Sequence, residues 1–157
     1  MMISYQRAGR LIAILMLLKW WEFQLVRTNY ERNRNLDVRY GGSATYVKPA
    51  TVYIGLFTAA PTVAGGGTEV AGSSYARVAV TNDATNWPNA VAGAKSNAVA
   101  LTFAQATGSW GTVTHVGIFD ALTAGNLQDF ASLTAAKTVQ NGDVVQFGVG
   151  SLAFSET

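Results

Sequence analysis

The chain of 157 residues contains no cysteine, only three prolines and a single histidine. The absence of cysteine excludes disulfides, thiolate chemistry and zinc sites built on cysteine ligands. Charged residues make up 13% of the chain and the net charge is +2. Domains built to bind nucleic acid usually carry a clear excess of basic residues, so this balance gives no support to such a function. The fold must therefore be held by packing, sheet hydrogen bonds or partner subunits.

The charge and the glycine that are present have an uneven distribution. Residues 1–40 contain seven of the eleven Lys and Arg residues, three acidic residues and one glycine, which gives a net charge of +4. Residues 41–157 contain fifteen of the sixteen glycines, four basic and six acidic residues, which gives −2. We interpret residues 1–40 as a basic, aromatic N-terminal arm and residues 41–157 as a β domain.

The arm has the composition of a helix. From Arg10 to Asp37 there is no Pro or Gly, and good helix formers are frequent, so we expect a helix here. The apolar run 11–18 follows two arginines as in a signal peptide, but Lys19 and two tryptophans follow without a cleavage pattern. Eight apolar residues also fall short of the ~20 that span a bilayer. We therefore expect a helical anchor whose apolar surface is covered by protein, either the β domain or another chain.

The side chains of the arm indicate what covers it. Aromatic residues beside arginine are typical of protein–protein hot spots. Glu31 and Asp37 are interleaved with the arginines, which argues against a polyanion as the partner. We therefore expect a protein partner, with no nucleic acid and no membrane. The contact residues that we expect are Leu15, Leu18, Trp20, Trp21, Phe23, Arg27, Arg32, Arg34 and Arg39.

The pattern of residues 41–157 indicates β structure throughout. Runs of β-branched and aromatic residues are separated by turns rich in Gly, Asn and Pro. We expect a long loop at 82–97 anchored by Trp87, and a β-bulge near Gly150 in the last strand. This pattern predicts a mainly β fold, an antiparallel sandwich or barrel with an N-terminal helical or extended arm. The expected strands are 51–58, 75–81, 98–103, 112–120, 126–133 and 144–154.

No group of residues forms a recognisable catalytic, metal or cofactor site. His115 lies on an expected strand with Val113 and Phe119 and without a second polar group, which favours a packed side chain. No serine lies in a G-x-S-x-G motif, and the triglycine at 65–67 lacks the Lys-Ser/Thr of a phosphate-binding loop. Glu69 and Arg77 flank a Gly-Ser-Ser turn, and we expect them to form a structural ion pair. We expect a protein that is not an enzyme and uses no cofactor.

Several segments resemble, in consistent order from about Tyr30 to Phe154, a family of small virion proteins of tailed bacteriophages. Tyr30, Asn33, Leu36 and Asp37 fit that family's opening helix motif, whereas residues 1–27 lie outside the resemblance. The segments that carry it are Pro49–Phe57, Gly67–Val70, Gly72, Tyr75–Arg77, Trp110–Asp120, Gly125–Leu127, Lys137–Val139 and Gly142–Asp143.

The resemblance implies a structural, non-enzymatic role on a virion, either on the head or on the tail. The chain shows neither long repeats nor a coiled coil, which fibres often have. We therefore expect a capsid decoration (cement) protein on the outer surface of the capsid. It would bind the major capsid protein as a homo-oligomer, with a trimer favoured. The alternative is a tail fibre or tail-tip protein that binds a host receptor, and a hydrolase of cell-surface polymer is a third possibility.

Overall fold

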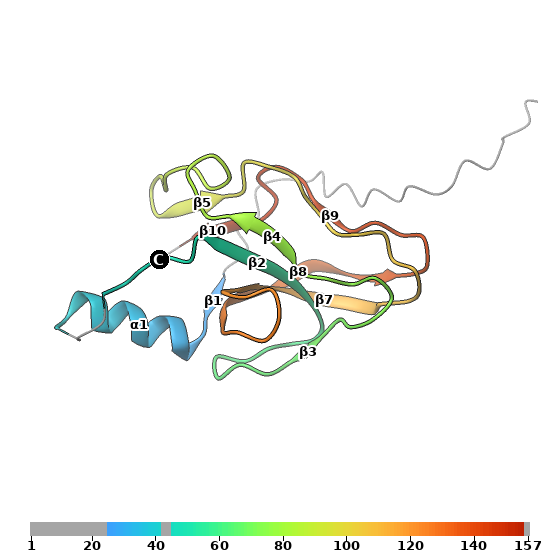
Figure 1. Ribbon diagram of the computed structural model, residues 1–157, viewed down its shortest axis with the longest axis horizontal. Helices are drawn as coiled ribbons and strands as arrows, with labels where there is room; N and C mark the ends of the chain where they lie inside the picture. Colours follow the sequence, from blue (N-terminus) through green and yellow to red (C-terminus); the bar gives the residue numbers. More distant parts are fainter. Residues whose placement is uncertain (1–24, 42–44, 156–157) are drawn as a thin grey trace, which may run out of the picture.

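A computed structural model describes residues 25–41 and 45–155 (Figure 1). A twisted antiparallel sheet forms the centre of the molecule, and one helix projects from its edge. The elements are β1 (Val26–Arg27), α1 (Asn29–Arg39), β2 (Thr51–Ala59), β3 (Thr68–Glu69), β4 (Val78–Thr81), β5 (Ala94–Ser96), β6 (Leu101–Thr102), β7 (Gly111–Phe119), β8 (Leu127–Val139), β9 (Gln146–Phe147) and β10 (Ala153–Ser155).

The main sheet has the strand order β1-β8-β7-β2-β3, and β4 also pairs with β2. Two small antiparallel sheets, β5 with β10 and β6 with β9, lie beside it. The prediction of a mainly β, antiparallel fold is confirmed, and the described part of the expected arm contains one short helix. The sequence predicted either a sandwich or a barrel, and the described strands do not close into a barrel.

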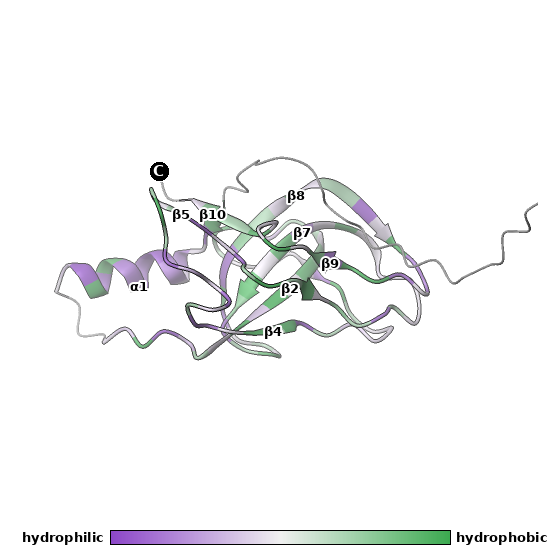
Figure 2. Cartoon of the chain, turned by 90° about the horizontal axis from the view of Figure 1, so that it is seen from above, coloured by the Kyte–Doolittle hydropathy of each residue, from purple (hydrophilic) through white to green (hydrophobic). Residues whose placement is uncertain are grey.

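The hydrophobic core lies on one face of the main sheet. Ile54 and Leu56 of β2 stand opposite Ile118 and Val116 of β7, and Ile54, Leu56 and Val116 are fully buried. Trp87 from the long loop packs against Phe154 at the rim of this core, with ring centroids 5.4 Å apart. Figure 2 shows the resulting concentration of hydrophobic residues on β2 and β7, in contrast to the hydrophilic α1.

The other face of the sheet is built around two opposed glycines. Gly55 of β2 pairs with Gly117 of β7, and the rings of Phe57 and Phe119 stack beside them with centroids 5.9 Å apart. A Cβ at Gly55 would lie 2.9 Å from the Phe119 ring, and one at Gly117 would lie 2.7 Å from the Phe57 ring. The glycines therefore allow two phenylalanine rings to lie against the backbone of the sheet.

Of the helix expected over residues 10–37, the part from Asn29 onward is confirmed as α1, but residues 26–28 before it are not helical. Val26 and Arg27 form a strand that pairs with Phe130 and Asp129 of β8, and α1 begins only after Thr28. The reason is local, because the Thr28 hydroxyl caps the helix by accepting a hydrogen bond from the Glu31 amide at 3.4 Å. Residues 1–24, which hold the rest of the expected helix, lie outside the described residues.

The expected strands of the body are present but differ in length. The central strands β2 and β7 match the expectation closely, and β8 runs six residues further than Leu133. The last expected strand, 144–154, is wrong because a turn at 148–151 divides it into β9 and β10. Gly150 has φ +74° in this turn, so the β-bulge expected near Gly150 is wrong and the chain makes a turn there instead.

Candidate functional site

Arg77 is the centre of a buried polar network that joins three parts of the fold. Its guanidinium donates to both carboxylate oxygens of Glu69, at 2.8 and 2.7 Å, and so forms a bidentate pair. It also donates to the carbonyls of Ala121 and Ala124, at 2.7 and 2.8 Å, and lies 3.3 Å from the centre of the Phe119 ring. The side chain thereby joins β3, the 120–126 loop and the start of β4.

Tyr75 extends this network into the core. Its hydroxyl donates to Glu69 at 2.9 Å and accepts from the Leu56 amide at 2.8 Å. Burial is the main reason that the pKa of Tyr75 is raised, so the phenol stays protonated and continues to donate. The Tyr75 hydroxyl and both carboxylate oxygens of Glu69 thus have partners within the fold, and the network serves to hold the fold together.

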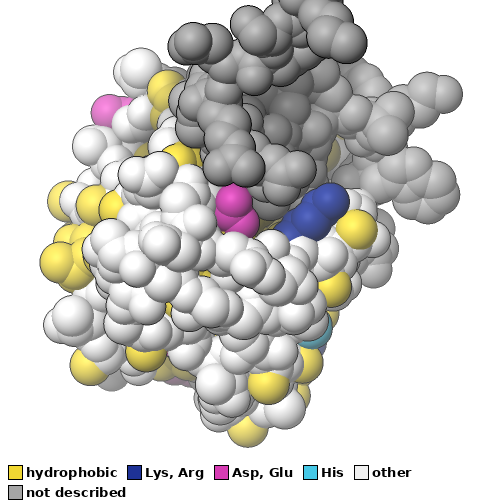
Figure 3. All heavy atoms as spheres, turned by 90° about the vertical axis from the view of Figure 1, so that its right-hand side faces the viewer, with side chains coloured by type: hydrophobic (Ala, Val, Ile, Leu, Met, Phe, Trp, Pro, Cys, Tyr) yellow, Lys and Arg dark blue, Asp and Glu magenta, His cyan; other side chains and the backbone are white. Residues whose placement is uncertain are grey.

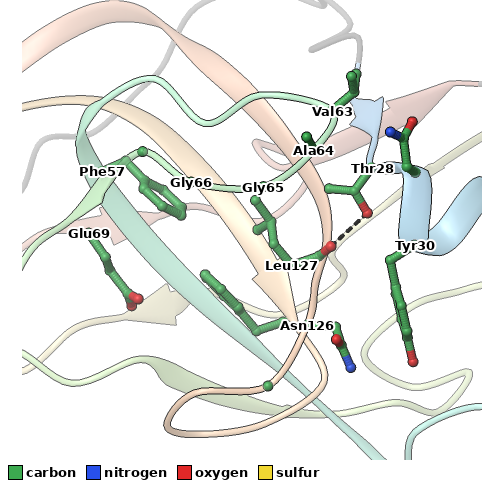
Figure 4. A pocket seen from close by; sticks show the side chains of 14 residues that line it. Thr28, Tyr30, Phe57, Val63, Ala64, Gly65, Gly66, Glu69, Asn126 and Leu127 are labelled. Carbon is green, nitrogen blue, oxygen red and sulfur yellow. Dashed lines mark hydrogen bonds between the residues drawn. The ribbon is translucent and has the colours of Figure 1, made fainter.

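An open cleft of about 560 Å³ lies next to this network, between the start of α1 and the triglycine loop (Figure 4). Phe57, Phe119 and Leu127 provide apolar lining, and Glu69 lies on one side with Tyr30 and Asn126 on the other. The loop is tied to the helix because the Asn29 amide donates to the carbonyl of Val63 at 2.7 Å. The remaining lining residues are Thr28, Asn29, Val63, Ala64, Gly65, Gly66, Gly67 and Gly125.

Thr28 forms the corner where β1, α1 and β8 meet. Its side chain is 2% exposed, and its hydroxyl donates to the carbonyls of Leu127 and Gln128, at 2.7 and 3.0 Å (Figure 4). Its amide donates to the Gln128 carbonyl as well, at 2.9 Å. The sequence analysis did not single out this residue, although the T-x-x-E pattern from Thr28 to Glu31 is a known signal for the start of a helix.

Charged groups gather where β1 and α1 pack on β8. Arg27 lies 3.9 Å from Asp129, its register partner on β8, and Glu31 forms an ion pair with Arg34 one turn along the helix. Burial raises the pKa of Asp129 to about 6, and the positive charge of Arg27 lowers it only in part. The Arg34 guanidinium also stacks on the Tyr46 ring at 4.4 Å, which ties the segment after the helix to α1.

The contact residues expected from the sequence are distributed as follows. Arg27 and Arg34 are engaged in the cluster just described, whereas Arg32 and Arg39 are exposed on α1. Leu36 and Tyr40 are also exposed, with 56% and 77% of their surface accessible. The other expected contacts, Leu15, Leu18, Trp20, Trp21 and Phe23, lie outside the described residues.

The described residues contain few candidates for a catalytic or metal-binding site. His115 pairs across the sheet with Phe57, its imidazole lies 2.8 Å from the Thr114 hydroxyl, and burial lowers its pKa. Within the described ranges 25–41 and 45–155, no three His, Asp or Glu side chains come close enough together to hold a metal ion. No helix in this part of the chain has the length and hydrophobicity to cross a membrane. On the face shown in Figure 3, the charged side chains are few and scattered.

Comparison with known proteins identifies the family. The family model described as podophage GP4 fiber I protein gp80 matches residues 27–155, which include most of the described chain. No curated protein matches this sequence. The expectation of a capsid decoration protein is wrong, because the matching family is one of fibre proteins; the lack of repeats and of a coiled coil was a misleading argument against a fibre. The family description names no partner, so contact with the major capsid protein and a trimeric state find no support in it.

Three findings agree with a structural role. The body is mainly β with a satisfied polar network, its described residues assemble no catalytic group, and the fibre family matches residues 27–155. The chain belongs to the gp80 family of podophage fibre proteins, non-enzymatic components of the phage virion.

Proposed function

We propose that this chain is a structural component of a podophage tail fibre, attached through residues 1–40 and displaying residues 41–157. The observation that carries the proposal is the match of residues 27–155 to a podophage fibre family. A fibre subunit needs a stable body and a surface for a neighbouring protein, and both features have support in the chain.

The surface for a neighbouring protein includes one stripe of α1. Arg32 and Leu36 are four residues apart and share one side of α1 with Arg39, and Tyr40 follows directly as the residue that caps the end of the helix. All four side chains are exposed, and the exposed Leu and Tyr are apolar surface that a partner would cover. Arg and Tyr are enriched at protein interfaces, which supports this stripe together with the aromatic residues of the arm as the attachment surface.

Labelling of intact virions tests the location. Gold-conjugated antibodies against the purified β domain are expected to label the tail fibres in electron micrographs. Labelling confined to the head would refute the proposal, whereas labelling at the tail in virions that lack the main fibre would point to another tail component.

Incorporation into virions tests the attachment surface. The double variant Leu36→Ser/Tyr40→Ser is expected to leave the body folded and to reduce the amount of this chain in purified virions at least about tenfold, a change of roughly 1.4 kcal/mol in binding. Val91→Ser is the matched control, because Val91 is a large exposed apolar residue, 75% accessible, in the 82–97 loop. Equal incorporation of the double variant and the control would contradict the assignment of the α1 stripe.

The cleft favours a second candidate function, binding of a host receptor. It combines an apolar floor with a carboxylate, amides and the Tyr30 phenol, a mixture suited to a small polar ligand or a glycan unit. Purified protein is expected to compete with phage for adsorption to host cells, and Asn29→Ala/Tyr30→Ala is expected to weaken that competition. Undiminished competition by the double variant, with Val91→Ala as control, would rule the cleft out as the receptor site.

A further inference from the structure

The turn between β8 and β9 contains an Asn-Gly pair, which is the most reactive asparagine sequence in proteins. The chain contains nine asparagines, and Asn141 is the one that precedes a glycine. Asparagine is thermolabile because the backbone nitrogen of the next residue can attack its side-chain amide. A glycine at that next position has no side chain to hinder the attack. Asn141 itself is exposed to water in the turn.

The reaction consumes only water and releases ammonia. The Gly142 nitrogen loses its proton and bonds to the side-chain carbonyl carbon of Asn141, and the side-chain nitrogen leaves as ammonia. Water then opens the resulting succinimide ring at either of its carbonyls, which gives aspartate or isoaspartate. Both products carry a negative charge at neutral pH where Asn141 was neutral. Isoaspartate also lengthens the main chain by one carbon.

The fold holds the attacking nitrogen in a hydrogen bond. The Gly142 amide donates to the carbonyl of Ala106 at 2.7 Å, and Ala106 is only 1% exposed. Buried backbone groups are costly to leave unpaired, so this hydrogen bond is rarely broken while the turn stays in place. The Gly142 nitrogen is therefore free to react only when the turn opens.

Three further hydrogen bonds fasten the same turn. The Ala106 amide donates to the carbonyl of Asp143 at 2.9 Å, and the exposed Gln105 side chain donates to the carbonyl of Gly142 at 2.9 Å. The Gln140 amide donates to the Asp143 carboxylate at 2.8 Å. Opening of the turn requires several of these bonds to break together, so the open form is a minor one in the folded protein.

We propose that Asn141 is a site of spontaneous, one-way modification that the folded turn protects. The hydrogen bond from Gly142 to Ala106 keeps the conversion slow, and each opening of the turn releases the amide nitrogen. Conversion adds a carboxylate to the turn that already contains Asp143, and isoaspartate displaces the Gly142 amide from its place opposite Ala106. A converted turn cannot restore its hydrogen bonds, so the joint between β8 and β9 is weakened permanently. A virion component is not replaced after assembly, and converted chains accumulate with age.

Peptide mapping by mass spectrometry tests the site and its protection. The full chain is incubated at mildly alkaline pH, both in buffer and in guanidinium chloride. Conversion appears as a gain of about 1 Da in the peptide that contains residues 140–143. We expect a rate about tenfold lower in buffer than in denaturant, and no gain in this peptide from Asn141→Ser. Equal rates in the two solutions would overturn the protection, and conversion at other asparagines alone would overturn the site.

A variant that loosens the turn tests the role of opening. Gln105→Ala removes the hydrogen bond to the Gly142 carbonyl from an exposed position, and is expected to raise the rate in buffer about threefold without changing it in denaturant. Gln146→Ala is the matched control, because the Gln146 side chain donates to the Thr102 hydroxyl at 2.6 Å, between β6 and β9. Equal rates in buffer for the two variants would overturn the role given to turn opening.

The stability of aged protein tests the consequence. Chains separated after conversion at residue 141 are expected to unfold at a temperature roughly 5 °C lower than unconverted chains from the same incubation, measured by circular dichroism. An unchanged midpoint in the isoaspartate fraction would overturn the weakening of the joint between β8 and β9.

Discussion

Replacement of Arg77 by Met tests whether the buried network holds the body of this fibre protein together. The change keeps the length and the apolar stem of the side chain, but removes two hydrogen bonds to Glu69, two to loop carbonyls and the contact with the Phe119 ring. Only 7% of the Arg77 side chain is exposed, whereas Glu69 is 25% exposed. The lost partners are therefore largely cut off from water, and solvent compensates Glu69 only in part.

The expected loss follows from this burial. Removing one member of a buried ion pair costs about 3–5 kcal/mol because the other charge is left uncompensated. Glu69 keeps its hydrogen bond from Tyr75 and some access to water, so we expect the lower end, about 3 kcal/mol. For a domain of this size such a loss lowers the unfolding midpoint by about 10 °C. Arg77→Lys keeps the charge but not the planar fork, and is expected to lose about half as much.

Urea unfolding followed by circular dichroism measures this loss, with Arg39→Met as the matched control on exposed helix surface. The control is expected to change the free energy of unfolding by less than about 0.5 kcal/mol. An Arg77→Met protein within about 1 kcal/mol of the natural one would refute the role given to the network. An Arg77→Lys protein with natural stability would refute the need for bidentate geometry.

Three further predictions concern single residues. Burial raises the pKa of Asp129 to about 6, above its value in the unfolded chain, so the folded state binds this proton more tightly and stability falls as pH rises from about 4 to 6. The variant Asp129→Asn should flatten that dependence and be about 2 kcal/mol more stable than the natural protein at pH 8. Identical pH profiles of stability for the two proteins would contradict this prediction. Gly55→Ala should cost about 2–3 kcal/mol in urea unfolding, because its Cβ would lie 2.9 Å from both Glu69 and Phe119, and a neutral effect would show that both neighbours move aside freely. Thr28→Ala should cost about 1–2 kcal/mol by loss of the helix cap and the bonds to β8, with Thr28→Ser as the control that retains them; equal losses would assign the effect to the methyl group.

The sequence was informative where local pattern and burial agree. The strand β2 contains a nearly continuous apolar run, which predicts a central strand covered on both faces, and β7 was predicted from its β-branched residues. Glu69 and Arg77 were expected to pair because they flank a short turn, and the structure contains that pair. The two carbonyls at 121 and 124 that complete the network are more than forty residues away, and no local pattern indicates them.

Sequence reasoning failed where two local signals compete, or where the residues in contact are distant in the sequence. Good helix formers in the arm outweighed the cap at Thr28, although the capping pattern would have moved the helix start to Asn29. The cleft and the buried Asp129 depend on contacts between α1, β8 and the triglycine loop, which only the assembled fold defines. Family membership, not composition, identified the chain as a fibre protein of the virion, because a fold does not by itself determine a function.

The opposed glycines at the centre of the sheet have a consequence for sequence divergence in this family. Phe119 lies against Gly55 while Phe57 lies against Gly117, so each glycine is matched to a ring on the neighbouring strand. A side chain gained at one glycine overlaps the opposing ring unless that ring becomes smaller and the second neighbour, Glu69 or Leu127, moves aside. A ring lost at one position leaves a void unless the glycine gains atoms. These four positions should thus be inherited as two coupled pairs, and homologues that vary at one member should carry a compensating change at the other.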